Sequence, residues 1–585
     1  MSGLLFGVTG KQVNRSTYTV VKRLQQTASH PLIKTSQQDV VPVFRRASNY
    51  TDKIALKDTY GRYTYGNLFM GAKELSSDIS VNVGRKNSER VLFLCPNDAS
   101  YVLTQWAIWM SGQIAVPLSS LHPQNLLEYY CNDSNAKLLV TIPEYAELMN
   151  RVAKNCNKQL LVLDDKLRQN ATQKVPSRQC DMDAGLSKDF YNRSNSMILY
   201  TSGTTGNPKG VVLTHKNIVT QITTLLDAWR WTENDTILHC LPLHHVHGIV
   251  NALMCPLYAG AKINMLPKFD KDNVWSHLLG VNETASNRIT TFMAVPTIYT
   301  KLIEEHKKLF SQDSKMCEHI KQILKTKVRL MVSGSAPLPI PVYEKWLEIS
   351  GHKLLERFGM TEIGMCLSNT YEGNREPGYV GLPLPGVSVR LALKQESSDN
   401  DYENLIEVTN CNGQINIKKN KLIEGNPVGE LHVKGESVFK EYFNRPQATQ
   451  KEFTEDGWFK TGDLAKFNMD KELFKMLGRT SVDIIKCGGY KVSALEIETH
   501  LLGHPKVADT AVVGLKDETW GEIICAIVVL KPEATMDQEE MREWAKTKMP
   551  EYTVPKQLKI VQQIDKNAMG KINKKELIKK LFPEN

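Results

Sequence analysis

Short apolar segments alternate with longer amphipathic segments along most of this chain, and this alternation constrains the fold more than any other feature. From about residue 50, strand-like runs are separated by stretches with helical periodicity, such as Asn217–Trp229. Such alternation is typical of α/β proteins with largely parallel sheets. The predicted strands are Arg90–Cys95, Lys137–Ile142, Gln159–Leu163, Met197–Thr201, Ile237–Leu241, Ile289–Val295 and Val328–Ser333.

The chain has 585 residues, too many for one compact core at roughly 100–200 residues per domain. We predict a large α/β domain over residues 41–478, with mixed or parallel sheets wrapped by helices. A small, Lys-rich α+β domain follows over 486–585, with strands near Thr510–Gly514 and Ile523–Leu530. The polar stretch 394–427 is expected to be a surface insertion or a loop-rich stretch.

Composition excludes several classes of protein. No apolar run approaches the ~18 residues that span a bilayer, so no transmembrane segment is predicted. The 11 cysteines form no C-x-x-C pair, which argues against a disulfide framework or a zinc ribbon. The net charge is +10. Nucleic-acid binding is nevertheless disfavoured, because the sequence shows no dense basic stripe with interleaved aromatics. A mild positive excess is compatible with small anionic substrates.

The N-terminal segment has the composition of a targeting sequence. Residues 1–38 contain no Asp or Glu, five basic residues and nine Ser or Thr. This composition fits a mitochondrial or plastid transit peptide, although a disordered basic tail that is not a targeting signal has the same composition. We favour a mitochondrial transit peptide over residues 1–40, delivery to the matrix, and a mature chain that begins within 25–45.

The most specific motif is a loop rich in Gly, Ser and Thr after the predicted strand Met197–Thr201. It spans Tyr200–Gly210 and reads YTSGTTGNPKG. Its glycines let the backbone approach an anion closely, and its hydroxyls and Lys209 offer donors for phosphate oxygens. No Lys-Ser or Lys-Thr pair closes the loop, so it is not a Walker A motif. The sequence therefore predicts a phosphate-binding loop of another type.

Six further motifs follow in order: Leu241–Gly248 (LPLHHVHG), Ser333–Leu338 (SGSAPL), Glu356–Glu362 (ERFGMTE), Thr461–Asp463 (TGD), Gly478–Thr480 (GRT) and Asn567–Lys571 (NAMGK). With the loop, they make the chain resemble the adenylate-forming enzymes over residues 45–582. That family includes acyl-CoA synthetases, luciferases and the adenylation domains of peptide synthetases. The resemblance implies that ATP activates a carboxylate as an acyl-adenylate, whose acyl group is then transferred, often to coenzyme A.

The resemblance implies roles for individual residues. Lys571 would bridge the substrate carboxylate and the α-phosphate, Thr361 would donate to that phosphate, and Glu362 would hold Mg²⁺. Phe358 would stack on adenine, although a core aromatic is the alternative. Asp463 would accept the ribose hydroxyls. The residues assigned to ATP are Thr201, Ser202, Gly203, Thr204, Thr205, Gly206, Asn207, Pro208, Lys209, Ser335, Phe358, Asp463 and Arg479.

Arg479 would contact ribose or phosphate, unless it forms a structural ion pair. The family rotates its C-terminal domain between two half-reactions, which implies a hinge at residues 479–485. The hinge residue is Ser481 or Asp483, because the chain departs from the family pattern there. Gly488, Gly489 and Tyr490 resemble the loop that faces coenzyme A. Cys487 is interpreted as an ordinary loop residue, because coenzyme A supplies the thiol.

Two residues bear on the acid. Arg329 interrupts an apolar strand, where a guanidinium needs a partner, either an internal carboxylate or an anionic substrate group. His247 could donate to the same group or simply pack. The run Lys327–Pro337 and the His-rich motif resemble malonyl-CoA synthetases, including the mitochondrial acyl-CoA synthetase family member of animals. This resemblance implies malonate and, less efficiently, methylmalonate as substrates, with Arg329 on the second carboxylate.

Other functions remain open from the sequence. A medium- or long-chain fatty acyl-CoA synthetase would need an apolar tunnel, and an acyl-adenylate ligase could load a carrier protein instead of coenzyme A. A catalytically inactive nucleotide-binding regulatory protein is disfavoured because Glu362, Asp463 and Lys571 are all present. We expect a monomer or a weak homodimer.

Overall fold

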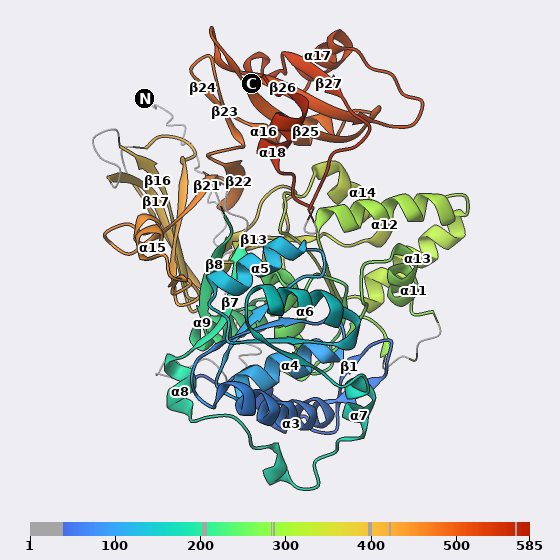
Figure 1. Cartoon of the computed structure of the whole chain (residues 1–585). Helices are drawn as coiled ribbons and strands as arrows, with labels where there is room; N and C mark the ends of the chain where they lie inside the picture. Colours follow the sequence, from blue (N-terminus) through green and yellow to red (C-terminus); the bar gives the residue numbers. More distant parts are fainter. Residues whose placement is uncertain are drawn as a thin grey trace, which may run out of the picture. The chain divides into compact units, whose positions relative to one another are not determined.

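The computed structural model describes residues 39–201, 207–281, 284, 287–395, 401–420, 423–567 and 570–584. Val40–Asn585 form one compact unit, and its described strands make four sheets with helices packed against them (Figure 1). All seven predicted strands overlap observed ones: β3, β5, β6, β7, β9, β11 and β12, with bounds given below. The predicted α/β class is therefore confirmed.

A nine-stranded sheet carries most of the motifs. Its order is β15-β14-β13-β12-β11-β9-β10-β1-β2, parallel from β13 to β1 and antiparallel at both margins. Its strands are β1 (Ile54–Lys57), β2 (Arg62–Thr64), β9 (Thr236–His239), β10 (Lys262–Met265), β11 (Thr291–Ala294), β12 (Leu330–Ser333), β13 (Leu355–Met360), β14 (Gly364–Ser368) and β15 (Leu382–Pro383). The motifs after β9 and β12 follow the carboxyl ends of parallel strands, where α/β proteins bind ligands.

A seven-stranded sheet carries the phosphate loop. Its order is β20-β8-β7-β4-β3-β5-β6, with a parallel centre and antiparallel pairs at β7–β8 and β8–β20. Its strands are β3 (Arg90–Leu94), β4 (Ile114–Pro117), β5 (Leu138–Thr141), β6 (Gln159–Val162), β7 (Asn195–Thr201), β8 (Lys209–Thr214) and β20 (Glu441–Tyr442). The loop therefore joins two hydrogen-bonded neighbours, β7 and β8, which fix its ends.

Helices cover these sheets. The principal ones are α3 (Tyr65–Val83), α4 (Ala99–Met110), α5 (Gln124–Asp133), α6 (Ala146–Asn155), α9 (His215–Ala228), α11 (Lys271–Leu279), α12 (Pro296–Leu309), α13 (Ser314–Lys327) and α14 (Ile340–Ser350). Every residue of α4 is buried, as expected of a helix that is apolar on all faces. Helix α9 begins directly after β8 because Thr214 and Asn217 form a capping box.

The two remaining sheets are largely antiparallel. One has the order β18-β17-β16-β19-β21-β22, with β16 (Val387–Lys394), β17 (Tyr402–Cys411), β18 (Gln414–Lys419), β19 (Val428–Gly435), β21 (Phe459–Asn468) and β22 (Leu473–Arg479). Residues 402–419 are thus a paired hairpin, so the loop-rich alternative was wrong for these residues, whereas a surface insertion stays a prediction. β18 is largely exposed and only part of β17 is buried, so their polar side chains gave this hairpin the composition of a loop.

The C-terminal residues form a sheet with its own apolar core. Its strands are β23 (Ile484–Cys487), β24 (Tyr490–Ser493), β25 (Val507–Asp517), β26 (Gly521–Leu530) and β27 (Gln557–Ile560), with helices α16 (Ala494–Leu501), α17 (Gln538–Lys546) and α18 (Lys574–Leu581). The domain boundaries at 478 and 486 stay a prediction. In the part of the chain that the structure describes, no helix is long and apolar enough to cross a membrane.

Candidate active site

The ends of the phosphate loop are held by aromatic and polar contacts to α5. Tyr200 stacks on Tyr130 with ring centroids 4.2 Å apart, and its hydroxyl donates to Asp133 at 2.9 Å. At the other end, the Tyr129 hydroxyl donates to the Pro208 carbonyl at 2.8 Å. Thr201 closes β7, and Asn207 precedes Pro208. The predicted ligands Ser202, Gly203, Thr204, Thr205 and Gly206 lie outside the described residues.

Lys209 and Glu362 meet around one aromatic ring. The Lys209 ammonium lies 4.1 Å from the centroid of the Tyr442 ring, and the Tyr442 hydroxyl donates to Glu362 Oε1 at 2.9 Å. Burial raises the pKa of Glu362, while Tyr442, Arg479 and Lys209 oppose that shift. Strand pairing of β20 with β8 brings Tyr442 to this position. The arrangement links the phosphate loop to the predicted metal ligand.

The chemistry around Glu362 fits magnesium. Glu362 is 5% exposed, and Tyr442 engages only one of its carboxylate oxygens among the described contacts. The described residues contain no cluster of three His, Cys, Asp or Glu side chains that could hold a metal alone. Mg²⁺ is commonly bound by one or two carboxylates together with substrate phosphates. Glu362 suits that mode, with ATP supplying the remaining oxygens.

Asp463 and Arg479 are cross-strand partners on β21 and β22. Arg479 Nε lies 3.0 Å from Asp463 Oδ1, and Arg479 Nη1 donates to the Thr461 carbonyl at 3.0 Å. Burial raises the pKa of Asp463 to about 6, with Arg479 and Lys571 favouring the ionised form. Arg479 therefore forms the structural ion pair that was raised from the sequence as its alternative role. Their contacts with ribose stay a prediction.

Lys571 extends from the C-terminal segment into the same group of charges. Loss of solvation is the largest cause that lowers the pKa of Lys571. The nearby carboxylates of Asp463 and Glu362 oppose this shift, and the cations Arg479 and Arg357 add to it. Lys571 nevertheless keeps an exposed surface. Its backbone N–H donates to Asn567 Oδ1 at 2.9 Å, which closes the turn of the Asn-x-x-Gly-Lys motif. This placement brings the predicted catalytic lysine beside the predicted ATP ligands.

At the end of the site formed by Ser335 and His247, called the acid end below, lies a buried guanidinium that sequence reasoning did not single out. Arg357, on β13, is 4% exposed and forms no ion pair with any described residue. Its Nη2 lies 3.4 Å from Ser335 Oγ, and its Nε has no hydrogen-bond partner among the described residues. A Cβ on Gly334 would lie 2.5 Å from Arg357 Cζ, so a larger residue there would displace the guanidinium. An arginine inside a matched motif strand was the available signal.

His247 completes this end of the site. Its Nδ1 lies 3.1 Å from Ser335 Oγ, and its Nε2 has no described partner. Burial, followed by repulsion from Arg357, lowers the pKa of His247 well below its usual range, so the imidazole is neutral. Ser335 adopts a positive φ of 72°, which presents its hydroxyl between the two side chains. Three polar groups with spare capacity therefore converge, as at a site for an anionic ligand group.

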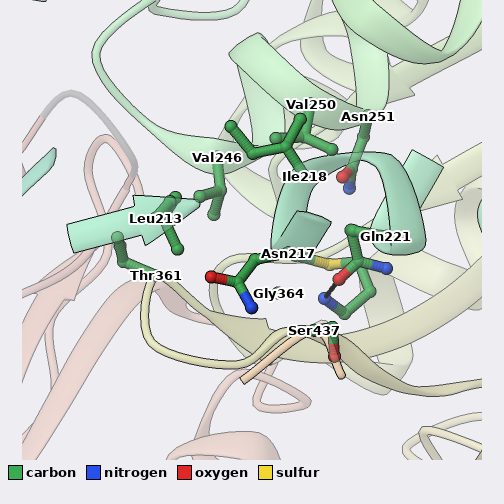
Figure 2. A pocket seen from close by; sticks show the side chains of 11 residues that line it. Leu213, Asn217, Ile218, Gln221, Val246, Val250, Asn251, Thr361, Gly364 and Ser437 are labelled. Carbon is green, nitrogen blue, oxygen red and sulfur yellow. Dashed lines mark hydrogen bonds between the residues drawn. The ribbon is translucent and has the colours of Figure 1, made fainter. Parts of the chain in front are cut away.

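Thr361 and Phe358 lie on or beside β13. Thr361 follows the strand and lines a small cavity (Figure 2). Phe358 is half-buried and packs against the main core, opposite Leu367 of β14. Phe358 therefore packs as a core aromatic, which was the alternative raised from the sequence. Its stacking on adenine and the phosphate contact of Thr361 stay predictions.

Arg329 is not part of the site, and its assignment to the substrate carboxylate was wrong. Its Nε and Nη2 donate to the two Asp235 carboxylate oxygens at 2.6 and 2.8 Å, and Nη1 donates to the Trp229 carbonyl at 3.0 Å. Both charged residues precede their strands, β12 and β9, whereas the site follows the carboxyl ends. Roughly 13 Å of strand separates the two edges. The internal carboxylate, left open as an alternative, is the actual partner.

The predicted coenzyme A loop lies in an exposed aromatic patch. Gly488 and Gly489 have φ values of 57° and 83°, which favour glycine. Tyr490 stacks on Tyr552 with centroids 4.6 Å apart. Trp520 borders Gly488, where a Cβ would lie 2.8 Å from the indole. Trp520 and Tyr552 were missed because they are distant in sequence, and pairing of β23 with β26 brings Trp520 near the loop. Coenzyme A contacts stay a prediction.

The two candidate hinge residues differ in their contacts. Asp483 Oδ2 accepts the Arg479 N–H at 2.9 Å, and Asp483 Oδ1 pairs with Lys574 at 2.6 Å. Lys574 also pairs with Glu498 at 2.7 Å and is 7% exposed. Ser481 is exposed. The hinge stays a prediction at either residue. Lys574 is therefore a structural residue.

Comparison with known proteins identifies the protein family. Residues 43–443 match the AMP-binding enzyme family, and residues 496–571 match the AMP-binding enzyme C-terminal domain. The chain therefore belongs to the AMP-binding enzyme family. This result confirms the resemblance to adenylate-forming enzymes that the ordered motifs indicated.

Individual proteins and solved structures that resemble the chain include malonate–CoA and malonyl-CoA ligases. The chain is 46% identical over 549 residues to the mitochondrial malonate–CoA ligase ACSF3 of Mus musculus, covering 93% of this chain and 91% of that protein. The crystal structure of ATP-bound MatB from Rhodopseudomonas palustris matches with a TM-score of 0.77 at 30% identity, covering 92% and 98% of the two chains. A malonyl-CoA ligase bound to methylmalonyl-CoA and AMP matches with a TM-score of 0.58 at 30% identity, covering 88% and 97%.

Proposed function

We propose that this chain joins malonate to coenzyme A at the expense of ATP, through a malonyl-adenylate, with release of AMP and pyrophosphate. The observation that carries the proposal is the Arg357 guanidinium, buried without a carboxylate partner among the described residues and within electrostatic reach of Lys571. A short diacid offers one carboxylate to each cation. The names of the relatives support the same substrate, and methylmalonate is proposed as a poorer one.

In the first half-reaction, one malonate oxygen attacks the α-phosphorus and the bond to pyrophosphate breaks. The reacting groups are both anionic, so the site must neutralise charge and hold the attack in line. Lys571 would bridge the carboxylate and the α-phosphate, while Asp463 would hold the ribose. Glu362 would hold Mg²⁺, which offsets phosphate charge when bound.

The second malonate carboxylate would be held by Arg357 with help from His247 and Ser335. A planar guanidinium binds a carboxylate through two parallel hydrogen bonds, and burial strengthens this pairing. The neutral imidazole can donate from Nε2, which has no described partner. A monocarboxylate would leave these groups unsatisfied, which is costly in a buried site. Selection for a diacid follows from that difference.

In the second half-reaction, the coenzyme A sulfur would attack the acyl carbon, and the bond to AMP breaks. The glycines at 488 and 489 would let the pantetheine arm pass close to the backbone. The exposed rings of Tyr490, Tyr552 and Trp520 offer faces for the nucleotide end. The two half-reactions would use two orientations of residues 486–585 around a hinge at 479–485.

The test is product formation by the purified chain with ATP, Mg²⁺ and coenzyme A. Malonate, methylmalonate, succinate, acetate, propanoate, butanoate and octanoate are compared by AMP release and by mass spectrometry of the thioesters. We expect malonyl-CoA to form with the highest kcat/KM and methylmalonyl-CoA with a lower one. Preference for octanoate would establish the rival fatty acyl-CoA synthetase, and AMP release without a thioester would favour a carrier-loading ligase.

We also propose mitochondrial delivery, to the matrix. The N-terminal 38 residues have a transit-peptide composition, and vertebrate relatives are named mitochondrial. The proposed mature chain begins within 25–45, and residues 1–38 lie outside the described residues. Imaging residues 1–45 fused to a reporter tests this, and a diffuse cytosolic signal would contradict it. A monomer or weak homodimer stays the expected oligomeric state.

A further inference from the structure

A small cavity lies beside the acid end of the site. Its volume is about 20 Å³, room for about one water molecule. It is bounded by α9, by the π-helix η4 (His247–Met254), and by Thr361 and Gly364 at the β13–β14 turn (Figure 2). His247 and Asn251 are four residues apart on η4, about one turn of a π-helix. The cavity therefore lies one turn beyond the residue proposed to bind the substrate carboxylate.

Two amides on its wall have unused hydrogen-bonding capacity. Asn251 is fully buried, and neither its Nδ2 nor its Oδ1 has a partner among the described residues. Gln221, on α9, is 4% exposed; its Oε1 accepts the Met365 N–H, but its Nε2 has no described partner. Figure 2 shows both side chains at the cavity. The Met365 N–H fixes the Gln221 amide, which packs directly on Gly364, where a Cβ would lie only 1.7 Å from Gln221 Oε1.

Two other polar side chains of the wall, Asn217 and Ser437, are already satisfied. Asn217 Nδ2 donates to the Glu436 and Val438 carbonyls at 2.8 and 2.9 Å. Ser437 Oγ donates to the Ile363 carbonyl at 3.0 Å. Asn251 and Gln221 are thus the wall residues that call for a polar occupant, because a buried polar group without a partner is costly. Apart from Thr361, the remaining wall is apolar, so shape alone would admit an alkyl group.

We propose that Asn251 and Gln221 form a polar end wall behind His247, which excludes the alkyl chains of longer monocarboxylates and restricts the enzyme to short, polar acids. The inference rests on the proposed function and adds its chain-length limit. An alkyl chain that entered the cavity would displace water and leave both amides unpaired. Each unpaired group weakens binding by about fivefold to a hundredfold. The wall therefore distinguishes this site from the apolar tunnel of a fatty acyl-CoA synthetase.

The test compares two substitutions of equal shape. Asn251→Val removes the polarity of the wall, whereas Asn251→Thr keeps a hydroxyl on a side chain of the same volume. kcat/KM is measured by ATP–pyrophosphate exchange with malonate and with the straight-chain acids from butanoate to octanoate. We expect Asn251→Val to raise the ratio of butanoate or hexanoate to malonate by about tenfold to a hundredfold. Asn251→Thr should change that ratio by less than about threefold.

Further variants keep the result interpretable. Asn264→Val is the matched control, because Asn264 on β10 is also a buried asparagine without described partners but does not line the cavity; its ratio should equal that of the wild type. Gln221→Met removes the second amide and should shift the ratio in the same direction as Asn251→Val, even if that variant fails to fold. Equal ratios in Asn251→Val and Asn251→Thr, or no shift in Asn251→Val and Gln221→Met, would overturn the inference. Failure of the wild type to use malonate would instead refute the proposed function.

Discussion

Replacing Arg357 with methionine should abolish the preference for malonate while leaving the fold intact. Methionine keeps an unbranched side chain but removes the charge and all the donors that face Ser335 and His247. Truncating one partner of a buried, hydrogen-bonded charge pair costs about 2–5 kcal/mol. At 1.36 kcal/mol per tenfold change, kcat/KM for malonate should fall by about 30-fold to 5,000-fold. For propanoate, which lacks the second carboxylate, the expected change is less than about fivefold.

The assay is ATP–pyrophosphate exchange with each acid, combined with thermal unfolding. Arg357 is buried without an ion-pair partner among the described residues, and burial lowers its pKa to about 9. Removing an unpaired buried charge relieves a desolvation cost. The midpoint of unfolding should therefore stay the same or rise. Equal losses with malonate and propanoate, or a lower unfolding midpoint, would refute the assignment of Arg357 to the substrate.

Three other perturbations separate structure from chemistry. Arg329→Met should lower the free energy of unfolding by about 3–5 kcal/mol in urea, because Asp235 is left buried and without its ion-pair partner. The ratio of malonate to propanoate activity should stay unchanged. A selective loss of malonate activity would contradict this. Lys571→Ala should reduce adenylate formation in a pyrophosphate-exchange assay by at least about a hundredfold, whereas the exposed Lys579→Ala should not; equal rates would remove Lys571 from catalysis. Because the pKa of Asp463 is raised to about 6, its carboxylate is lost as the pH falls through 6, so kcat/KM for ATP should fall there, and this acid limb should vanish in Asp463→Asn.

The positions of most site residues follow from local sequence because motifs sit next to regular strands. The phosphate loop joins β7 and β8, and the Ser333–Leu338 motif follows β12, as the apolar runs indicated. The ends of parallel strands bring such motifs together, whatever their separation in sequence. The fold class and the place of these motifs beside their strands were therefore accessible before any coordinates, whereas their contacts with ATP stay a prediction.

The acid side was not accessible in the same way, because charge pairing is a tertiary property. Arg329 and Arg357 both interrupt or adjoin apolar strands, and the sequence gives no sign that Asp235, 94 residues earlier, neutralises the first. Arg357 has no such partner among the described residues, which makes it the better cation for a substrate. Asn251 was equally hidden, since its unpaired amide is visible only against the packed wall of the cavity.

The most direct test of the central claim is isotope exchange between labelled pyrophosphate and ATP, catalysed by the purified chain with Mg²⁺ and without coenzyme A. This reaction reports formation of the acyl-adenylate alone. We predict exchange that requires an added acid and is fastest with malonate. Exchange that ignores malonate but proceeds with another acid, or no exchange with any acid, would contradict the account.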